Sequence, residues 1–215
     1  MKIRKAEEKD WQGIYRFLSE IVTEGETYAI NRDAGEEELK HLWLKKPEAC
    51  FVAMLDGRLA GSYYLKKNQQ GGGSHVCNAG YIVDPEFRGR GLARKMCAHS
   101  IETALEMGFE AMQYNFVVST NVGAIHLWKS MGFQIVGTLP GAFRHPEQGP
   151  VEALIMFRFL YQELGMKIFE PFPLRYRAVN RVIECPSVLH SLYVRLQLCP
   201  CLEASSLLRY QFKCT

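Results

Sequence analysis

Apolar residues recur at helical spacing in four segments of the chain. The first predicted helix begins after Asp10, the second covers residues 36–44, the third begins at Leu92 and stops at Gly108, and the fourth begins after Asn121. The apolar faces of the three longer helices consist of Trp11, Ile14, Tyr15, Leu18, Ile21 and Val22; of Ala93, Cys97, Ile101 and Ala104; and of Ala124, Leu127, Trp128 and Met131.

Apolar runs bounded by turn residues separate these helices and predict strands. The predicted strands cover residues 2–6, 50–55, 58–67, 75–83 and 110–117. Asp56-Gly57 indicates a hairpin, and QQGGGS at residues 69–74 indicates a turn. Two later strands are expected on either side of GAFRHPEQG, residues 141–149. Together these elements predict a mixed α/β domain over residues 1–160.

Charge divides the chain near residue 160. The first 160 residues balance 19 Lys and Arg against 19 Asp and Glu, so the net charge of +3 comes from residues 161–215. A balanced domain without a basic face argues against nucleic-acid binding. The remainder shows no lasting period, and two interpretations stay open for it: a poorly ordered extension, or a read-through or frame-shifted end. We assign residues 161–215 no function.

The chain shows no sign of a membrane or secretory role. No apolar run is long enough for a membrane span, and the N-terminus lacks the apolar segment of a signal peptide. The seven cysteines form no disulfide framework, which favours a cytoplasmic location. Four of them lie in the last part of the chain, at Cys185, Cys199, Cys201 and Cys214, with a spacing that fits no standard zinc site. No metal is expected.

The stretch FRGRGLARKM, residues 87–96, places two glycines where a strand passes into a helix. Free N–H groups and the positive end of the helix dipole favour anions there, and glycine lets a bulky anion approach the backbone. The phosphate-loop pattern GxxxxGK[ST] is absent, and GxGxxG fails because Arg94 follows Ala93. The pattern that remains, Arg-Gly-x-Gly-x-Ala after a strand, predicts a pyrophosphate site, and a simple glycine-rich turn is the alternative.

A second motif, NVGAIHLWKSMGF at residues 121–133, follows about thirty residues later. The two motifs together resemble the GCN5-related N-acetyltransferase (GNAT) family over roughly residues 2–160. This resemblance implies a GNAT fold, with six or seven mostly antiparallel strands splayed into a V and about four flanking helices. It also implies acetyl-coenzyme A (acetyl-CoA) as cosubstrate.

The resemblance assigns cofactor contacts to individual residues. It implies that the backbone of Ile82 and Val83 pairs with the pantetheine arm. It implies that the N–H groups of residues 88–93 hold the pyrophosphate and that Asn121 contacts the cofactor arm. The residues 88–93 are Arg88, Gly89, Arg90, Gly91, Leu92 and Ala93, and the side chains of Arg88 and Arg90 add positive charge.

The reaction needs a neutral amine to attack a thioester, with donors for the oxyanion. The N–H of Val83 or Ile82 is the expected donor. Many family members place a tyrosine, as acid to the departing thiolate, where this chain has Trp128, and an indole N–H cannot serve as that acid. Trp128 is equally well interpreted as a core residue or as a wall of the cofactor tunnel. Cys77 and Cys97 are interpreted as core thiols.

Several residues are candidates for the acceptor site. Glu24 and Glu26 follow the first predicted helix. Arg144 and His145 lie in the segment 141–149 between the two last predicted strands, and Arg144 can hold a carboxylate there. Asn78 and Asn115 lie on the two strands that splay apart, where amides can orient a small amine. The set Asn78, Asn115 and Asn121 resembles acetyltransferases that act on proline analogues such as azetidine-2-carboxylate.

The sequence thus predicts an acetyl-CoA-dependent N-acetyltransferase that uses direct transfer to a small amine or amino acid, with Asn78, Val83 and Asn115 as catalytic residues. Two alternatives stay open: a protein or peptide N-acetyltransferase, and a non-catalytic acyl-CoA sensor, which Trp128 favours. Family members are often dimers, so a homodimer is compatible with the resemblance.

Overall fold

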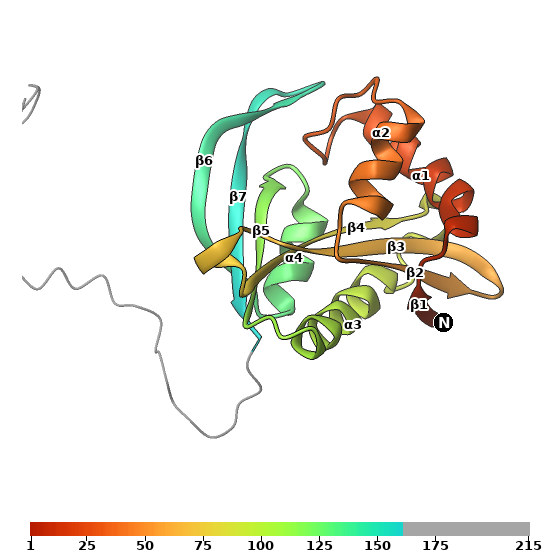
Figure 1. The fold of residues 1–215 in the computed structure, drawn as a ribbon. Helices are drawn as coiled ribbons and strands as arrows, with labels where there is room; N and C mark the ends of the chain where they lie inside the picture. Colours follow the sequence, from red (N-terminus) through yellow and green to blue (C-terminus); the bar gives the residue numbers. More distant parts are fainter. Residues whose placement is uncertain (161–215) are drawn as a thin grey trace, which may run out of the picture. The chain divides into compact units, whose positions relative to one another are not determined.

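The computed structural model describes residues 1–160, which form a seven-stranded sheet in the order β1-β2-β3-β4-β5-β7-β6 (Figure 1). The strands are β1 (Lys2–Lys5), β2 (Ala49–Leu55), β3 (Arg58–Lys67), β4 (Val76–Val83), β5 (Ala111–Val118), β6 (Gln134–His145) and β7 (Gly149–Phe159). Neighbouring strands are antiparallel except β4 and β5. The mixed, mostly antiparallel sheet agrees with the six or seven strands that the resemblance implies.

Four α-helices cover the sheet: α1 (Trp11–Glu24), α2 (Glu36–Lys40), α3 (Leu92–Glu106) and α4 (Val122–Ser130). A π-helical turn, His41–Lys45, extends α2, so the two together fill the predicted segment 36–44. In Figure 1, α1 and α2 lie on one side of the sheet and α3 lies on the other. The alternation of strand residues therefore separates two apolar layers.

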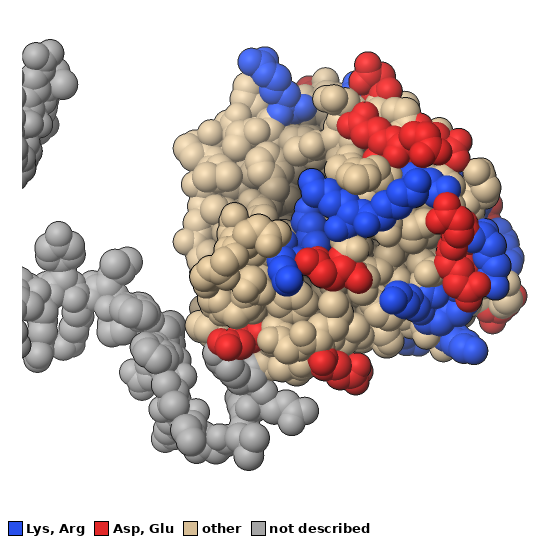
Figure 2. Space-filling model, in the orientation of Figure 1, with Lys and Arg blue, Asp and Glu red and all other residues tan. Residues whose placement is uncertain are grey.

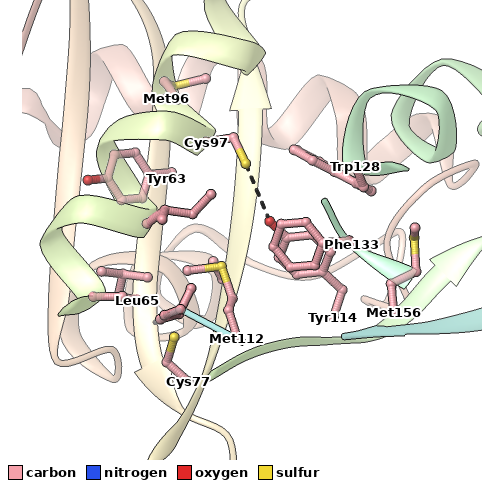
Figure 3. Close-up of a cluster of buried hydrophobic side chains, with 14 of the residues drawn as sticks. Tyr63, Leu65, Cys77, Met96, Cys97, Met112, Tyr114, Trp128, Phe133 and Met156 are labelled. Carbon is pink, nitrogen blue, oxygen red and sulfur yellow. Dashed lines mark hydrogen bonds between the residues drawn. The ribbon is translucent and has the colours of Figure 1, made fainter. Parts of the chain in front are cut away.

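Each layer has its own core. Trp11, Phe17, Leu39 and Trp43 from α1, α2 and the π-helical turn pack against Val52 and Ile82 of the sheet. On the other face, α3 and α4 pack against β3, β4, β5 and β7 (Figure 3). Residues of this second core include Tyr63, Met96, Cys97, Met112, Tyr114, Trp128 and Phe133.

β4 and β5 separate after a short contact. They pair in register only at Val76 with Ala111 and at Cys77 with Met112. Beyond that point β4 stays paired with β3, while β5 turns to β7 through a bulge between Tyr114 and Val117. Because a bulge bends its strand, the separation continues toward the ends of both strands. The result is the V-shaped opening that the resemblance predicts.

Local signals placed most elements within one or two residues. The hairpin turn has Asp56 and Gly57 at positive φ, 51° and 78°, as a tight two-residue turn requires. Asp10 stands at the N-cap of α1 without making a cap hydrogen bond, because its carboxylate accepts from both terminal nitrogens of Arg4 instead. His145 belongs to β6 rather than to a loop between strands. The predictions for residues 161–215 lie outside the described residues.

Candidate functional site

The opening between β4 and β5 is a cavity of about 1120 Å³. It is lined by the segment after α1, the faces of β3, β4 and β5, the starts of α3 and α4, and the turn between β6 and β7. Figure 2 shows basic side chains gathered near the middle of one face of the molecule, beside the lobe that β6 and β7 form. The volume lies above the range of about 300–1,000 Å³ that is usual for pockets of small ligands.

One end of the cavity is the glycine loop, residues 88–93. Gly89 and Gly91 have φ of 76° and 72°, which disfavours any other residue type. An ideal Cβ on either glycine meets no atom within 4 Å, so the space in front of the loop is open. The first turn of α3 leaves its N–H groups without helical partners, because the first bond within it runs from Lys95 N–H to the Gly91 carbonyl. This geometry fits a pyrophosphate.

The structure corrects the first member of the set of backbone N–H groups, residues 88–93, that were predicted to hold the pyrophosphate. The N–H of Arg88 donates to the carbonyl of Pro85 at 3.3 Å, so it closes a turn rather than facing an anion. The amide N–H of Arg94, within the first turn of α3, takes its place at the other end of the set. The exposed Arg94 guanidinium donates to the Ser130 hydroxyl at 2.7 Å and links α3 to α4.

The side chains around the loop hold it in place. The Arg90 guanidinium stacks over the Phe87 ring, 5.3 Å from its centroid, and Arg90 does not line the cavity, whereas Arg88 does. Asp84, the buried residue before the loop, forms an ion pair with Arg16 of α1 and accepts from the Glu86 N–H at 3.0 Å. The loop is thus anchored from a helix that lies 68 residues earlier in the chain.

Tyr28 reaches into the opening from the segment after α1. Its hydroxyl donates to the Tyr81 carbonyl at 2.7 Å and accepts from the Tyr81 N–H at 3.0 Å. Burial raises the pKa of Tyr28, so its phenol stays protonated. These two bonds show that the backbone groups of Tyr81 point into the opening. The sequence contains no signal for this contact, because its partners are 53 residues apart.

Backbone groups alternate along a strand, so those of Val83 face the same side as those of Tyr81. Ile82 stands opposite Ser62 of β3, and its N–H and C=O point that way. The neighbouring Asp84 N–H confirms the alternation, since it donates to a carbonyl of β3 at 3.0 Å. The predicted backbone role of Ile82 is therefore wrong, although the residue still lines the cavity. Val83 supplies the available donor, because the N–H of Tyr81 already donates to the Tyr28 hydroxyl.

The three asparagines all line the cavity. Asn78 is buried and donates to the Gln113 carbonyl at 3.0 Å, across the point where β4 and β5 separate. Asn115 is exposed, and its amide joins the Asn68 side chain at 2.6 Å. Asn121 caps α4, where its Oδ1 accepts from the Ala124 N–H at 3.1 Å. This cap engages only the oxygen, so the amide NH₂ of Asn121 remains a donor.

Of the two residues predicted to bind the acceptor, Arg144 and His145, only one lines the cavity. His145 is buried and lines the cavity, whereas Arg144, its exposed neighbour, does not. Successive strand residues point to opposite faces, so one side chain of such a pair points away. The His145 Nδ1 accepts from the N–H groups of Glu147 and Gln148 at 3.2 and 3.3 Å, which places the ring proton on Nε2. His145 is therefore a donor to the cavity.

Three carboxylates also line the cavity. Glu26 lines it as predicted, together with Glu24 and Glu147. None of the three forms an ion pair with another residue in the range 1–160. The cavity thus holds unpaired acidic groups near the opening of the sheet.

Trp128 satisfies both interpretations offered for it. It is buried in the second core, with its ring 4.9 Å from that of Tyr81 and 5.0 Å from that of Tyr114, and it also lines the cavity (Figure 3). The hydroxyls of Tyr81 and Tyr114 bond to each other at 3.1 Å, and burial raises the pKa of both phenols well above the ordinary value. No hydroxyl occupies the position of Trp128.

The core cysteines are not nucleophiles. Burial raises the pKa of Cys77 to about 12 and that of Cys97 to about 11, so both stay thiols at neutral pH. Figure 3 shows Cys97 pointing to the Tyr114 hydroxyl in the packed core. Within residues 1–160 no group of His, Cys, Asp or Glu is arranged to hold a metal ion. No helix in this range is long and apolar enough to cross a membrane.

A family comparison agrees with this geometry. Residues 11–133, more than half of the chain, match the model of the acetyltransferase (GNAT) family. The chain belongs to the acetyltransferase (GNAT) family. A solved GNAT structure, a GCN5-related N-acetyltransferase from Kribbella flavida, is 41% identical with a TM-score of 0.71, covering 74% of this chain and 96% of that one. The predicted family and fold are therefore confirmed.

Among characterised sequences, this chain is similar to acetyltransferases that carry different names. N-acetyltransferase aca1 of Schizosaccharomyces pombe is 35% identical over 98 residues, which is 45% of this chain and 47% of the relative. The matched segment thus spans about half the length of that relative. L-amino acid N-acetyltransferase AaaT of Escherichia coli is 28% identical over 142 residues, covering 63% of this chain and 84% of the relative.

Proposed function

We propose that this GNAT domain transfers an acetyl group from acetyl-CoA to the amine of a small amino acid or similar small amine, by direct attack. The observation that supports this most is the continuity of the cavity. One connected space is lined by the glycine loop at the start of α3, the edge of β4 that β5 leaves unpaired, and a polar region between β4 and β5. The anionic part of acetyl-CoA, its extended arm and a small acceptor would therefore bind next to one another in this cavity.

The cofactor end of the cavity fits acetyl-CoA. The N–H groups of residues 89–94 and the cavity-lining Arg88 would hold the pyrophosphate, and the edge of β4 would bind the amide groups of the pantetheine arm as an added strand does. The Asn121 NH₂ is placed to donate to the same arm. Acetyl-CoA supplies an activated acyl group, and its thiolate is a tolerable leaving group because thiols have an ordinary pKa near ~8.5.

We infer that the N–H of Val83 faces the thioester oxygen, where negative charge develops, because the Tyr81 N–H already donates to the Tyr28 hydroxyl. Such fixed donors stabilise that charge without reorganising, and removal of one from comparable sites costs about 3–4 kcal/mol. The acceptor amine must lose a proton, and Glu24, Glu26 and Glu147 line the cavity where water or a carboxylate can take it. His145 is excluded as the base in this tautomer, since its Nε2 already holds a proton.

Asn78 and Asn115 are proposed to orient the acceptor, with His145 donating through Nε2. Similarity to an L-amino acid N-acetyltransferase supports a small acceptor. Trp128 favours a second candidate, an acyl-CoA-binding sensor without turnover, because no phenol stands where many family members have one.

Thiol release from acetyl-CoA tests this proposal. Amino acids, proline analogues, polyamines and short peptides are offered as acceptors, with acetyl-CoA binding measured separately. Turnover confined to small amines supports the proposal and shows that Trp128 is compatible with catalysis. Turnover only with peptides favours a peptide acetyltransferase, and tight acetyl-CoA binding without turnover on any acceptor favours the sensor.

A further inference from the structure

The side chain of Lys66 lines the cavity without an anionic partner. It extends from β3 on the same face as Tyr64, with its Nζ 5.4 Å from the centroid of the Tyr64 ring. The residue is half-buried, and burial lowers its pKa, with Lys46 acting in the same direction and Glu48 in the opposite one. Across residues 1–160, its ammonium makes no ion pair and no hydrogen bond. A cation withdrawn from water gains from an anion that reaches it.

The nearby carboxylate of Glu48 acts on Lys66 without forming an ion pair with its ammonium. Glu48, which raises the pKa of Lys66, accepts the backbone N–H of Lys67 at 2.8 Å. Lys67 is exposed and does not line the cavity. The sequence pattern YYLKK ends a strand, where two lysines normally indicate a solvated end. Only the cavity distinguishes the first lysine from the second.

The position of Lys66 separates it from the pyrophosphate. Lys66 stands directly opposite Asn78 in the register of β3 and β4, at the point where β4 and β5 separate. Val83, the end of β4 nearest the glycine loop, is five residues further along, about 17 Å at the usual rise of a strand. The anion that Lys66 attracts is therefore not the pyrophosphate of the cofactor.

Charges of both signs line the cavity. Glu24, Glu26 and Glu147 line it together with Lys66, and none of the four forms an ion pair with another described residue. A polyamine would suit the carboxylates but would be repelled by Lys66. An amino acid has a carboxylate for the lysine and an amine for the acidic side, so it matches both.

We propose that Lys66 binds the carboxylate of the acceptor, which makes the acceptor an α-amino acid or a close analogue rather than a simple amine. This inference rests on the proposed acetyl transfer and specifies its substrate class. Lys66 takes the role that the sequence assigned to Arg144, whose side chain lies outside the cavity. Asn78, which stands opposite Lys66, and His145 also line the cavity and add polar groups for a small zwitterion.

The test compares Lys66→Gln and Lys66→Arg with Lys67→Gln, a control that removes the same charge one residue away on the other face. Each variant is assayed by thiol release with amino acids and their primary amides. The amine of an amino acid amide is less basic than that of the amino acid itself. The kcat/KM of each acceptor is therefore compared between variants, and the amino acid is not compared directly with its amide. Binding is measured in parallel as the shift in Tm that each amino acid produces in the presence of CoA.

We expect Lys66→Gln to lower kcat/KM for the amino acid by about 10- to 100-fold, mainly through KM, and to change the amide less than about threefold. Lys66→Arg retains most of the activity, Lys67→Gln resembles the wild type, and the KM for acetyl-CoA stays unchanged. Equal losses for acid and amide overturn the proposal, as does a rise in the acetyl-CoA KM or a preference for polyamines.

Failure of the proposed function gives a different result. If wild type releases no thiol with any acceptor, acetyl transfer to small amines is wrong, and the Tm shift decides the role of Lys66. A shift with amino acids that Lys66→Gln abolishes and Lys67→Gln preserves supports the carboxylate site. Absence of any shift in wild type, or an equal shift in both variants, overturns it.

Discussion

Replacing Gly91 by Glu tests the glycine loop most directly. The substitution places a carboxylate where the loop is open to solvent and no atom lies within 4 Å of a Cβ, so sterics alone do not block the cofactor. A full charge about 5 Å from a pyrophosphate charge costs roughly 3 kcal/mol at an effective dielectric constant of about 20. Since about 1.4 kcal/mol is tenfold in Kd, we expect acetyl-CoA to bind at least about 100-fold more weakly.

Gly108 supplies a matched control at the other end of α3. It also has positive φ, 84° against 72° at Gly91, and an ideal Cβ there also meets no atom within 4 Å. Both Glu variants therefore have the same left-handed strain, about 1–2 kcal/mol, and the same added charge. The helix rise puts the two sites about 25 Å apart, so only Gly91→Glu places its carboxylate near the cofactor.

The assay is calorimetric titration of acetyl-CoA into wild type and both variants, with thermal unfolding as the measure of folding. We expect both variants to lose about 2–8 °C in Tm and to unfold cooperatively. Only Gly91→Glu should lose affinity, and added salt should weaken binding by wild type as it screens the charges. Equal Kd values in wild type and Gly91→Glu, or equal losses in the two variants, would refute the assignment of the loop.

Three further changes test the architecture. Arg4 holds the pKa of Asp10 low, so Asp10→Asn should lose about 1–2 kcal/mol of unfolding free energy at pH 7 and converge with wild type as pH falls below about 4; a constant gap contradicts this. Gly80→Ala puts a Cβ 2.6 Å from the Tyr64 ring, so it should cost about 1–3 kcal/mol in urea unfolding; an unchanged urea midpoint contradicts this. Tyr28→Phe removes two hydrogen bonds and should lower the unfolding free energy by about 1–2 kcal/mol; an unchanged urea midpoint argues against that contribution.

The cofactor end of the cavity was predictable because its determinants are local. Positive φ at Gly89 and Gly91 and the free N–H groups of a helix start depend on a few consecutive residues, and the sequence shows them directly. Even there the pattern did not show which amides were free. A motif does not specify the turn in which the Arg88 N–H is bonded. It also does not specify the pairing with β3 that points the backbone groups of Ile82 away from the opening.

The acceptor end was predicted less well. Arg144 and His145 are neighbours in sequence, yet strand geometry sends only His145 into the cavity. Lys66 and Tyr28 were missed because their importance arises from contacts across the sheet and between segments far apart in the chain. A charged residue at a strand end looks solvated until its neighbours are known.

The sequence by itself determined the order of elements, the glycine loop and the family, since these depend on hydrophobic periodicity, turn chemistry and local backbone conformation. Only the tertiary structure decided which backbone groups of β4 face the opening, which asparagines and carboxylates share the cavity, and which lysine remains unpaired there. The physical reason is that charge, burial and hydrogen-bond partners are properties of neighbours in space. In this chain those neighbours come from β3, β4, β5 and the segment after α1.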